Sequence, residues 1–326
     1  MHRLNWRDGD PDIMASFVIP EGAVFASVSD QLVEKGILPK RDKWLLKIQA
    51  KRMDADKRLA IGTVELPLNA SVNTIIEGIV NVPREIKTLT IIEGWDLHDI
   101  KDYLVEQDIK GAKDLFDYTG VPGRDYREQR GQPKEMLSKN YAVLKHKPWY
   151  VSMEGYLFPD TYDVFENATV EDVLDKMLSR MDHFIDIGAV ENFNFVGWTV
   201  HEALTVASII EQEVQKNDDR RKVSDIIIKR NSVNWALQMD STVNYATRGD
   251  KPAVSIAETK VDSPYNTYKY PGLPLGPIAA PSKNSMEATL NPWGNQFYYF
   301  LTDSSGTVYY GESLDQHNAN KARYLK

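Results

Sequence analysis

Apolar residues recur at helical spacing in several segments of the chain, and one of these segments has an acid within its apolar face. The segment is TVHEALTVASIIEQEV at 199–214, which predicts an amphipathic helix. Glu211 projects into the apolar stripe, whereas Glu202 and Glu213 fall on the other side of the helix. The members of the stripe are Val200, Ala203, Leu204, Ala207, Ile210 and Val214.

An acid in this position has two interpretations. A carboxyl held against apolar neighbours has a raised pKa, so we expect Glu211 to carry a proton near neutral pH and to act as a general acid. We expect desolvation to be the main cause of this shift. The alternative is a glutamate at the edge of the stripe that reaches solvent or pairs with an arginine. The helix alone leaves both interpretations open.

A second pattern is a repeat. FVIPEGAVFASVSDQLVEK at 17–35 and LTIIEGWDLHDIKDYLVEQ at 89–107 align without a gap, and we call these segments the first copy and the second copy. Each copy predicts a β-branched strand, a tight turn at Glu-Gly and an amphipathic helix. Between them the pattern predicts a helix at 42–53, a strand at 63–66 and a helix at 72–80.

These elements predict an α+β protein with a small α/β module at its N-terminus. Further along, the spacing predicts helices at 170–187 and 222–231 and a strand at 296–303, and Gly and Pro residues predict a linker or loop at 119–135. We expect four parts. They are an extension at 1–15, the module at 16–85, the second copy with a linker at 86–150, and a mixed α+β domain at 151–326.

Composition excludes several classes of function. The chain has 326 residues, no cysteine and a net charge of −8, which argues against nucleic-acid binding and excludes disulfides and thiolate chemistry. His201-Glu202 begins like a zinc-protease helix, but Thr205 stands where that motif needs a second histidine. We therefore expect no metal and no cofactor. No run of residues is long and apolar enough for a membrane span.

Three segments supply polar and aromatic side chains that suit sugar binding: EGYLFPDTY at 154–162, LQMDSTVNY at 237–245 and SPYNTYKYPGLPLGPI at 263–278. Hydroxyl, amide and carboxyl groups bind sugar hydroxyls, and aromatic faces stack on C–H surfaces. Each segment has an ordinary alternative, because Glu154, Asp160 and Asp240 could instead cap helices or pair with arginines.

Together with ASIIEQE at 207–213 and HNANKARYL from His317, these segments resemble the YceG-like (MltG) family of endolytic murein transglycosylases. The resemblance extends from about Phe17 to the C-terminus, and the duplicated N-terminal part is similar to LysM modules. It implies a lyase that cleaves the MurNAc–GlcNAc β-1,4 bond of peptidoglycan without water and leaves 1,6-anhydro-MurNAc ends. Its biological role would be in cell-wall assembly and glycan chain termination.

The resemblance also implies roles for individual residues. Glu211 would be the catalytic acid and then the base. The side chains that would orient the sugars are Gln238, Asp240, Asn266 and Tyr268, with Glu154 as a supporting partner. We expect Glu211 to line a cleft with 237–245 and 263–278. Three positions depart from the family pattern: Ser241 and Leu275 each replace a proline, and Lys229-Arg230-Asn231 replaces Asn-Arg-Leu.

Family members carry an N-terminal membrane helix that this sequence does not contain. The resemblance therefore implies that the chain is the extracytoplasmic part of a single-pass inner-membrane protein. Its partners would be peptidoglycan strands and cell-wall synthases, with no nucleic acid. Two alternatives remain at this point, a hydrolytic muramidase with the same acid and a non-catalytic peptidoglycan-binding scaffold.

Overall fold

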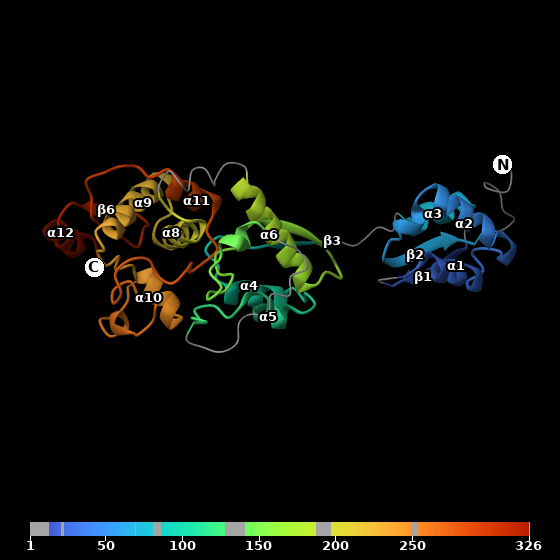
Figure 1. The fold of residues 1–326 in the computed structure, drawn as a ribbon, viewed down its shortest axis with the longest axis horizontal. Coiled ribbons are helices and arrows are strands. Elements are labelled where there is room, and N and C mark those ends of the chain that lie inside the picture. Colours follow the sequence, from blue (N-terminus) through green and yellow to red (C-terminus); the bar gives the residue numbers. More distant parts are fainter. Residues whose placement is uncertain are drawn as a thin grey trace. The chain divides into compact units, whose positions relative to one another are not determined.

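The structure is a computed structural model, and it describes residues 13–20, 23–68, 70–80, 86–127, 141–186, 197–249 and 253–325. The chain divides into two compact units, which we call the N-terminal unit (Met1–Ile86) and the C-terminal unit (Lys87–Lys326). Figure 1 shows the helices and strands of each. Each unit has a hydrophobic core of its own.

The N-terminal unit is a two-stranded antiparallel sheet with three helices. Strands β1 (Met14–Ile19) and β2 (Gly62–Pro67) pair with Phe17 opposite Val64. Alternate residues of both strands are buried, so one face of the sheet belongs to the core. The helices are α1 (Phe25–Glu34), α2 (Lys43–Arg52) and α3 (Val72–Val80), and their buried apolar residues share a cluster with that face.

The C-terminal unit is mainly helical, with two further small sheets. One sheet pairs β3 (Ile86–Thr90) with β4 (Thr161–Phe165), and the other pairs β5 (Tyr299–Thr302) with β6 (Val308–Gly311). Its helices are α4 (Leu97–Glu106), α5 (Leu115–Thr119), α6 (Val170–Asp186), α8 (Val200–Glu213), α9 (Asn217–Ser232), α10 (Asp240–Thr247), α11 (Lys283–Leu290) and α12 (Leu314–Tyr324).

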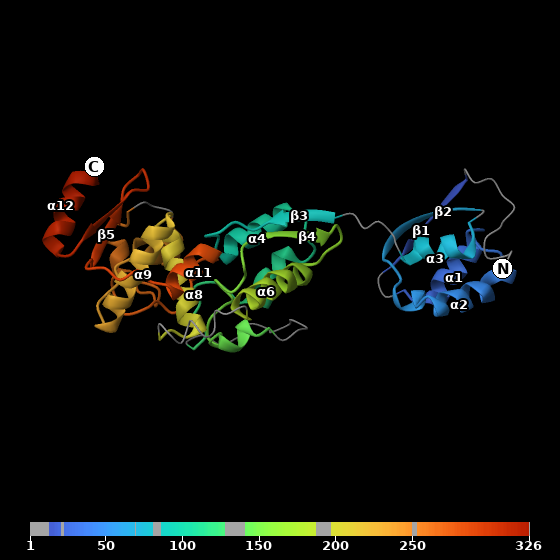
Figure 2. The same cartoon turned by 90° about the horizontal axis from the view of Figure 1, so that it is seen from above.

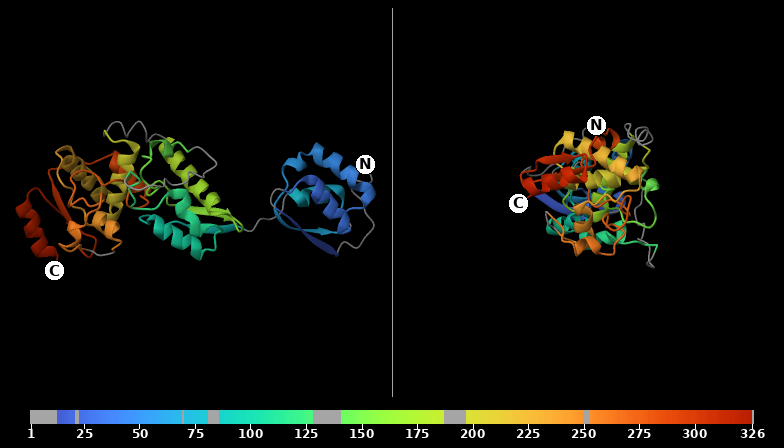
Figure 3. Two further views of the ribbon diagram at one scale, coloured as in Figure 1. Left: turned by 60° about the horizontal axis from the view of Figure 1, so that its bottom comes forward. Right: turned by 90° about the vertical axis from the view of Figure 1, so that its left-hand side faces the viewer.

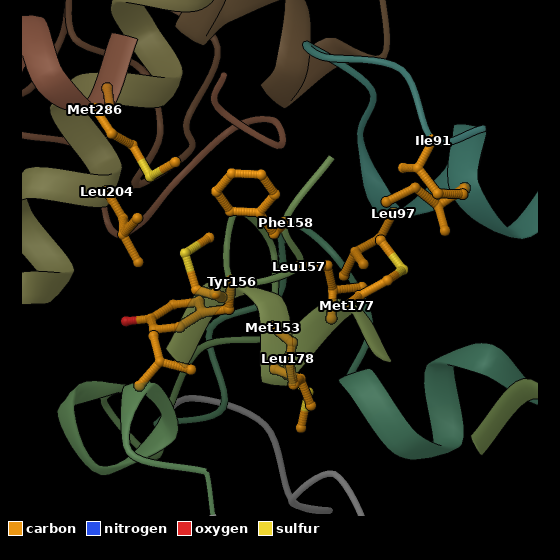
Figure 4. Packing of buried hydrophobic residues seen from close by; sticks show 14 of the residues in the cluster. Ile91, Leu97, Met153, Tyr156, Leu157, Phe158, Met177, Leu178, Leu204 and Met286 are labelled. Carbon is orange, nitrogen blue, oxygen red and sulfur yellow. The ribbon is translucent and has the colours of Figure 1, made fainter. Parts of the chain in front are cut away.

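The second copy of the repeat is built into the large core of this unit. Its strand β3 lies beside β4, as Figure 2 shows, with Thr88 bonded to Asp163 across the pair. Figure 4 shows Ile91 and Leu97 of this copy among buried side chains of α6, α8 and α11. The helix that carries Glu211 and the second copy therefore share one core.

The C-terminal end of the chain forms a hairpin with a helix beside it. β5 and β6 pair antiparallel, with Phe300 opposite Tyr310. Helix α12 packs against this hairpin, as Figure 3 shows in red, and the Tyr309 and Tyr324 rings stack at 3.6 Å between centroids. Phe300, Val308 and Tyr310 of the hairpin pack against the core of the unit.

Most of the predicted elements are confirmed. The helices predicted at 42–53, 72–80, 170–187 and 199–214 are α2, α3, α6 and α8, and the strand predicted at 63–66 is β2. The predicted turn of the second copy is present, with Gly94 at φ 83°. The corresponding turn of the first copy, at Glu21 and Gly22, lies outside the described residues.

Three boundaries differ from prediction. Helix α9 begins at Asn217. The prediction placed its start at residue 222, because the first turns of the helix are polar and carry no apolar periodicity. The strand predicted at 296–303 is shorter, spanning only β5. Of the loop predicted at 119–135, residues 120–127 form turns and 128–140 lie outside the described residues.

The mixed α+β class is confirmed, with small antiparallel sheets. Likeness of the N-terminal part to LysM modules stays a prediction. Within the described ranges, no helix has both the length and the apolar character needed to cross a membrane.

Candidate functional site

Helix α8 places Glu211 in its last turn. The helix begins at a capping box, in which the Thr199 hydroxyl accepts from the Glu202 amide at 3.2 Å and the Glu202 carboxylate accepts from the Thr199 amide at 2.8 Å. Every residue from Ala203 to Ile210 is then buried, so this part of the helix is covered on all sides. The cap and the buried face fix the position of the helix, and so the direction in which Glu211 points.

The Glu211 carboxylate accepts hydrogen bonds from two neighbouring helices. Arg220 of α9 donates from Nη2 to Oε1 at 3.0 Å. At the N-terminus of α11, Oε2 accepts from the Ser282 amide at 3.0 Å, from the Ser285 hydroxyl at 2.7 Å and from the Ser282 hydroxyl. The Glu211 and Arg220 side chains are only 8% and 10% exposed. Glu211 is thus a buried, ion-paired carboxylate with three further donors.

This pairing corrects the expectation of an unpaired, desolvated acid, which was wrong. The chain turns back directly after α8, so α9 starts close to the end of α8 and places Arg220 opposite Glu211. A buried charge is tolerated when a partner and additional hydrogen bonds satisfy it, as these four donors do. The alternative interpretation, a glutamate with an arginine partner, describes the structure.

The turn of the second copy lies against Glu211. Gln212 donates from Nε2 to the Gly94 carbonyl at 2.7 Å, and Gly94 and Trp95 exchange backbone hydrogen bonds with Ala280 at 2.8 Å each. A Cβ on Gly94 would lie 3.8 Å from Glu211 Cγ. Sequence reasoning did not select Glu93 of this turn as a site residue. The Glu-Gly pair of the repeat was the available signal, but it indicated only a turn.

Segments 237–245 and 263–278 are joined to each other. The Gln238 amide donates to the Thr267 carbonyl at 3.1 Å, and the Met239 amide donates to the Thr267 hydroxyl at 3.0 Å. The Tyr268 hydroxyl donates to the Asp240 carboxylate. Gln238 is exposed. Three of the predicted sugar-binding residues, Gln238, Asp240 and Tyr268, therefore belong to one locally connected structure.

Asn266 makes its hydrogen bonds within its own loop. Its side chain is buried, and its Nδ2 donates to the carbonyls of Thr259 at 3.1 Å and Val261 at 2.8 Å. Its Oδ1 accepts from the Tyr268 amide at 3.0 Å. These bonds occupy both ends of the amide, so Asn266 shapes the loop that carries Tyr268.

Glu154 is buried at 2% exposure and caps a helix. Both of its oxygens lie 3.2 Å from the Leu97 amide at the start of α4, and Oε2 accepts from the Tyr245 hydroxyl at 3.1 Å. Burial raises the pKa of Glu154 well above its usual range, and the negative charge of Asp96 adds to the shift. Asp160, by comparison, pairs with Arg180 at 2.9 Å.

Helix α8 is the scaffold to which both segments attach. The Ser241 hydroxyl and amide donate to Glu213 at 2.6 and 3.3 Å, and the Ile278 amide donates to the Ser208 hydroxyl at 3.0 Å. Burial is the main cause of a raised pKa at Glu213. Among the hydrogen bonds of the described residues, those of Glu211 go to α9 and α11 and not to the predicted sugar-binding residues.

Both replacements of a family proline use the amide that a proline lacks. The Ser241 amide donates to Glu213, and the Leu275 amide donates to the Pro264 carbonyl at 3.1 Å. In the third departure, Lys229 donates from Nζ to the Asn295 carbonyl at 2.7 Å. Arg230, which matches the arginine of the family pattern, donates to the carbonyls of Tyr298, at 2.8 Å, and Leu237, at 2.5 Å.

A polar pocket of about 680 Å³ lies at the start of α9. It is lined by Lys216, Asn217, Asp218, Asp219, Lys222, Thr307, Val308 and Tyr310. Asn217 connects it to Glu211, because its side-chain oxygen accepts from Arg220 Nη1 at 3.1 Å. This pocket is not the cleft that we expect between Glu211, 237–245 and 263–278, and that cleft stays a prediction. Over the described part of the chain, no three His, Asp or Glu side chains gather in a way that could hold a metal ion.

Three comparisons with known proteins agree on one family. The model of the YceG-like family matches residues 17–323. An endolytic murein transglycosylase of Bacillus subtilis is 38% identical over 193 residues, and one of Streptococcus pneumoniae R6 is 29% identical over 324 residues. These alignments cover 59% and 94% of this chain but only 51% and 58% of the relatives. The crystal structure of a YceG-like protein from Listeria monocytogenes superposes with a TM-score of 0.59 at 28% identity, covering 94% of this chain and 99% of that one.

Proposed function

For this chain, which belongs to the YceG-like family, we propose the activity named for its curated relatives, endolytic cleavage of murein by a lytic transglycosylase. The resemblance to the family is thereby confirmed. The observation that carries the proposal is the buried carboxylate of Glu211, held by Arg220 and two serines at the end of a fixed helix. Such a group can give up and take back one proton at a defined position.

The proposed reaction uses a hydroxyl of the substrate as the nucleophile. Protonated Glu211 gives its proton to O4 of GlcNAc as the C1–O4 bond breaks. The O6 oxygen of MurNAc then closes on C1, and the O6 proton returns to Glu211. Atoms and charge balance without water, so neither a second nucleophile nor a bound water is required. Positioning of O6 close to C1 supplies much of the acceleration.

The Glu211 carboxyl accepts hydrogen bonds from Arg220, Ser282 and Ser285, and in the proposed cycle its ionised form accepts the O6 proton. Arg220 and the three donors of α11 stabilise that form. Each turnover therefore requires Glu211 to take up a proton before it can act as the acid.

Gln238, Asp240 and Tyr268 remain our candidates for sugar contacts. They lie in two segments that are bonded to each other and to α8. In this proposal Asn266 and Glu154 support the site without contacting the sugars. Asn266 holds the loop of Tyr268, and Glu154 holds Tyr245 and the start of α4.

The N-terminal unit is proposed to be a LysM-like module that grips glycan strands. It folds around its own core, and Glu211 belongs to the other unit. Binding of a strand by such a module would raise the effective concentration of substrate at the catalytic unit. We also retain the proposals of a membrane anchor outside this chain, an extracytoplasmic location and cell-wall synthases as partners.

The test is mass spectrometry of the fragments that the purified chain releases from glycan strands. The proposal predicts internal cleavage with 1,6-anhydro-MurNAc ends. Reducing MurNAc ends would instead identify a hydrolytic muramidase, and binding without any cleavage would identify a scaffold protein. Either result would overturn the proposed reaction.

A further inference from the structure

The polar pocket at the start of α9 is formed by two parts of the C-terminal unit. One wall is the beginning of α9, and the other is strand β6 with the residue just before it. The Tyr310 hydroxyl donates to the Asp219 carboxylate at 2.6 Å, which joins the two walls. The Thr302 hydroxyl of β5 donates to the Glu213 carbonyl at 3.1 Å and ties the hairpin to the end of α8. The chain itself therefore holds the pocket in shape, and its volume of about 680 Å³ is typical of ligand-binding pockets.

The pocket is linked to the proposed catalytic acid by one side chain. Asn217 lines the pocket, and its side-chain oxygen accepts from Arg220 Nη1 at 3.1 Å. The other end of the same guanidinium donates from Nη2 to Glu211 Oε1 at 3.0 Å. A group bound in the pocket would therefore lie close to the glycan bond that Glu211 is proposed to cleave.

The pocket carries charges of both signs. Lys216 and Lys222 supply positive charges, and Asp218 supplies a negative charge. Within the ranges that the structure describes, these three side chains form no ion pair, unlike Arg220 further along the same helix. They are therefore available to a ligand that has both carboxylates and an ammonium group.

Aromatic rings lie beside these charges. The Lys222 ammonium is 5.1 Å from the centre of the Tyr310 ring and 5.6 Å from the centre of a Trp293 ring. Trp293 is 48% exposed, and Phe297 stacks on Tyr310 with 4.9 Å between ring centres. Val308 adds an aliphatic side chain to the wall. A ligand in the pocket would thus meet apolar surface as well as charge.

We propose that this pocket binds the stem peptide of the glycan strand, which is attached to the lactyl group of MurNAc. Such a peptide has carboxylates, an ammonium group and short aliphatic side chains, so it matches the two lysines, Asp218 and the aromatic wall. It is attached to the sugar whose C1–O4 bond is cleaved, so a pocket linked to Glu211 is within its reach. The sugar rings of the strand are uncharged and would not use the charged groups. This inference rests on the proposed function, in which Glu211 cleaves next to MurNAc.

The first measurement follows binding alone. A muramoyl tripeptide, which is MurNAc bearing L-Ala, D-Glu and a diamino acid, is titrated into the whole chain while backbone amides are observed by NMR. We expect shifts concentrated at 216–222 and 307–310, and much smaller shifts there with MurNAc alone. Substitution of both lysines, Lys216→Gln with Lys222→Gln, should weaken binding of the tripeptide about threefold to tenfold, since partly exposed charge pairs contribute modestly. Lys176→Gln is the matched control, because Lys176 is an exposed lysine of α6 that does not line the pocket.

Three results of this titration would overturn the inference. They are the absence of shifts at 216–222 and 307–310, equal shifts with MurNAc alone, and equal weakening of binding in Lys176→Gln. The second of these would identify a sugar subsite in place of a peptide site.

The second measurement compares cleavage of peptide-bearing strands with cleavage of strands whose peptides an amidase has removed. We expect the wild-type chain to have the higher kcat/KM on peptide-bearing strands, and the ratio of the two values to fall at least about threefold in the double variant. The ratio should stay at its wild-type value in Lys176→Gln. A variant that folds poorly lowers both values together, so the ratio reports the pocket and not the stability of the chain.

The two measurements separate the inference from the proposed function. If the tripeptide binds at the pocket but the wild-type chain cleaves no strand, the proposed function fails while the assignment of the pocket stands. If strands are cleaved and the ratio does not change in the double variant, the proposed function stands and the inference fails.

Discussion

The first copy of the repeat helps to form a small core of its own, whereas the second copy belongs to the core that carries Glu211. Their helices bury equivalent positions, Val28 and Leu32 in one and Ile100 and Leu104 in the other. They also end alike, because Gly36 and Asp108 have positive φ and donate to Val33 and Val105. The helices of the two copies thus bury equivalent positions and end in the same way.

The neighbours of the two copies differ. Strand β1 pairs with β2 inside the N-terminal unit, whereas β3 pairs with β4, which lies more than 70 residues away along the chain. The turn of the second copy is bonded to Gln212 and Ala280, next to the candidate catalytic carboxylate. A repeated pattern of apolar residues therefore specifies the element and not the function that the element serves.

The largest effect that we expect comes from Glu211→Gln. The amide keeps the shape of the side chain but has no proton to transfer, so strand cleavage should fall by about 10²- to 10⁴-fold. Rates of product formation, with folding checked by circular dichroism, measure this loss. Glu106→Gln serves as the control at an exposed position of the second copy. Retention of more than about a tenth of the activity in Glu211→Gln would remove Glu211 from its role.

The next effect compares ion pairs in the two units. Arg220→Met leaves the buried Glu211 carboxylate without its cation, which should reduce the free energy of unfolding by about 3–5 kcal/mol. The Lys43–Asp30 pair of the N-terminal unit is more exposed, at 25% and 68%, so Lys43→Met should reduce the free energy of unfolding far less than Arg220→Met. Urea denaturation of both variants checks the difference. Equal losses would show that burial of the Arg220 pair has no energetic consequence.

Removing the N-terminal unit should separate binding from chemistry. Deletion of residues 1–85 leaves β3 and the large core in place. We expect about a tenfold or greater loss of activity on intact sacculi, because a tethered binding module adds effective concentration, and little change in turnover of short glycans. Equal losses on both substrates, in a chain that still folds, would mean that the N-terminal unit supports the structure of the catalytic unit instead.

A smaller effect comes from two glycines with positive φ. Gly36 has no atom within 4 Å of an added Cβ, whereas a Cβ on Gly94 would lie 3.3 Å from Gln212 Nε2. Alanine should cost each position about 1–2 kcal/mol from backbone strain. Only Gly94→Ala should also lower the turnover of short glycans. If both variants cleave at the wild-type rate, the turn of the second copy has no part in the site.

The smallest effect concerns the helix ends of the copies. Asp108 occupies the left-handed position that Gly36 occupies in the first copy, with φ 53° against 71°. Asp108→Gly should therefore stabilise the C-terminal unit by about 0.5 kcal/mol, since glycine adopts this conformation without steric cost. Thermal denaturation measures the change. A loss of stability would show that the two helix ends are not equivalent.

Local patterns predicted most of the helices and strands, because apolar spacing reports which face of an element is buried. The stripe around Glu211 gave helix α8, and the repeat gave both copies. The pattern could not show what each face packs against. Arg220 is nine residues after Glu211 in the chain, and the short connection between α8 and α9 makes it a buried partner.

The same limit applies to the other site residues. Motifs selected Asn266 and Glu154 as sugar-site candidates. In the structure Asn266 donates to backbone carbonyls of its own loop, and Glu154 accepts from the Leu97 amide and the Tyr245 hydroxyl. Long-range neighbours of a charged group decide its chemistry, and a single sequence does not contain them.

The central claim is that Glu211 cleaves the strand with a hydroxyl of the substrate as nucleophile. Digestion of glycan strands in water labelled with heavy oxygen tests it directly, with the wild-type chain and Glu211→Gln side by side. We predict that wild-type fragments end in unlabelled 1,6-anhydro-MurNAc and that Glu211→Gln releases almost no fragments. Heavy oxygen at the new MurNAc ends, or the same fragments from Glu211→Gln, would contradict the claim.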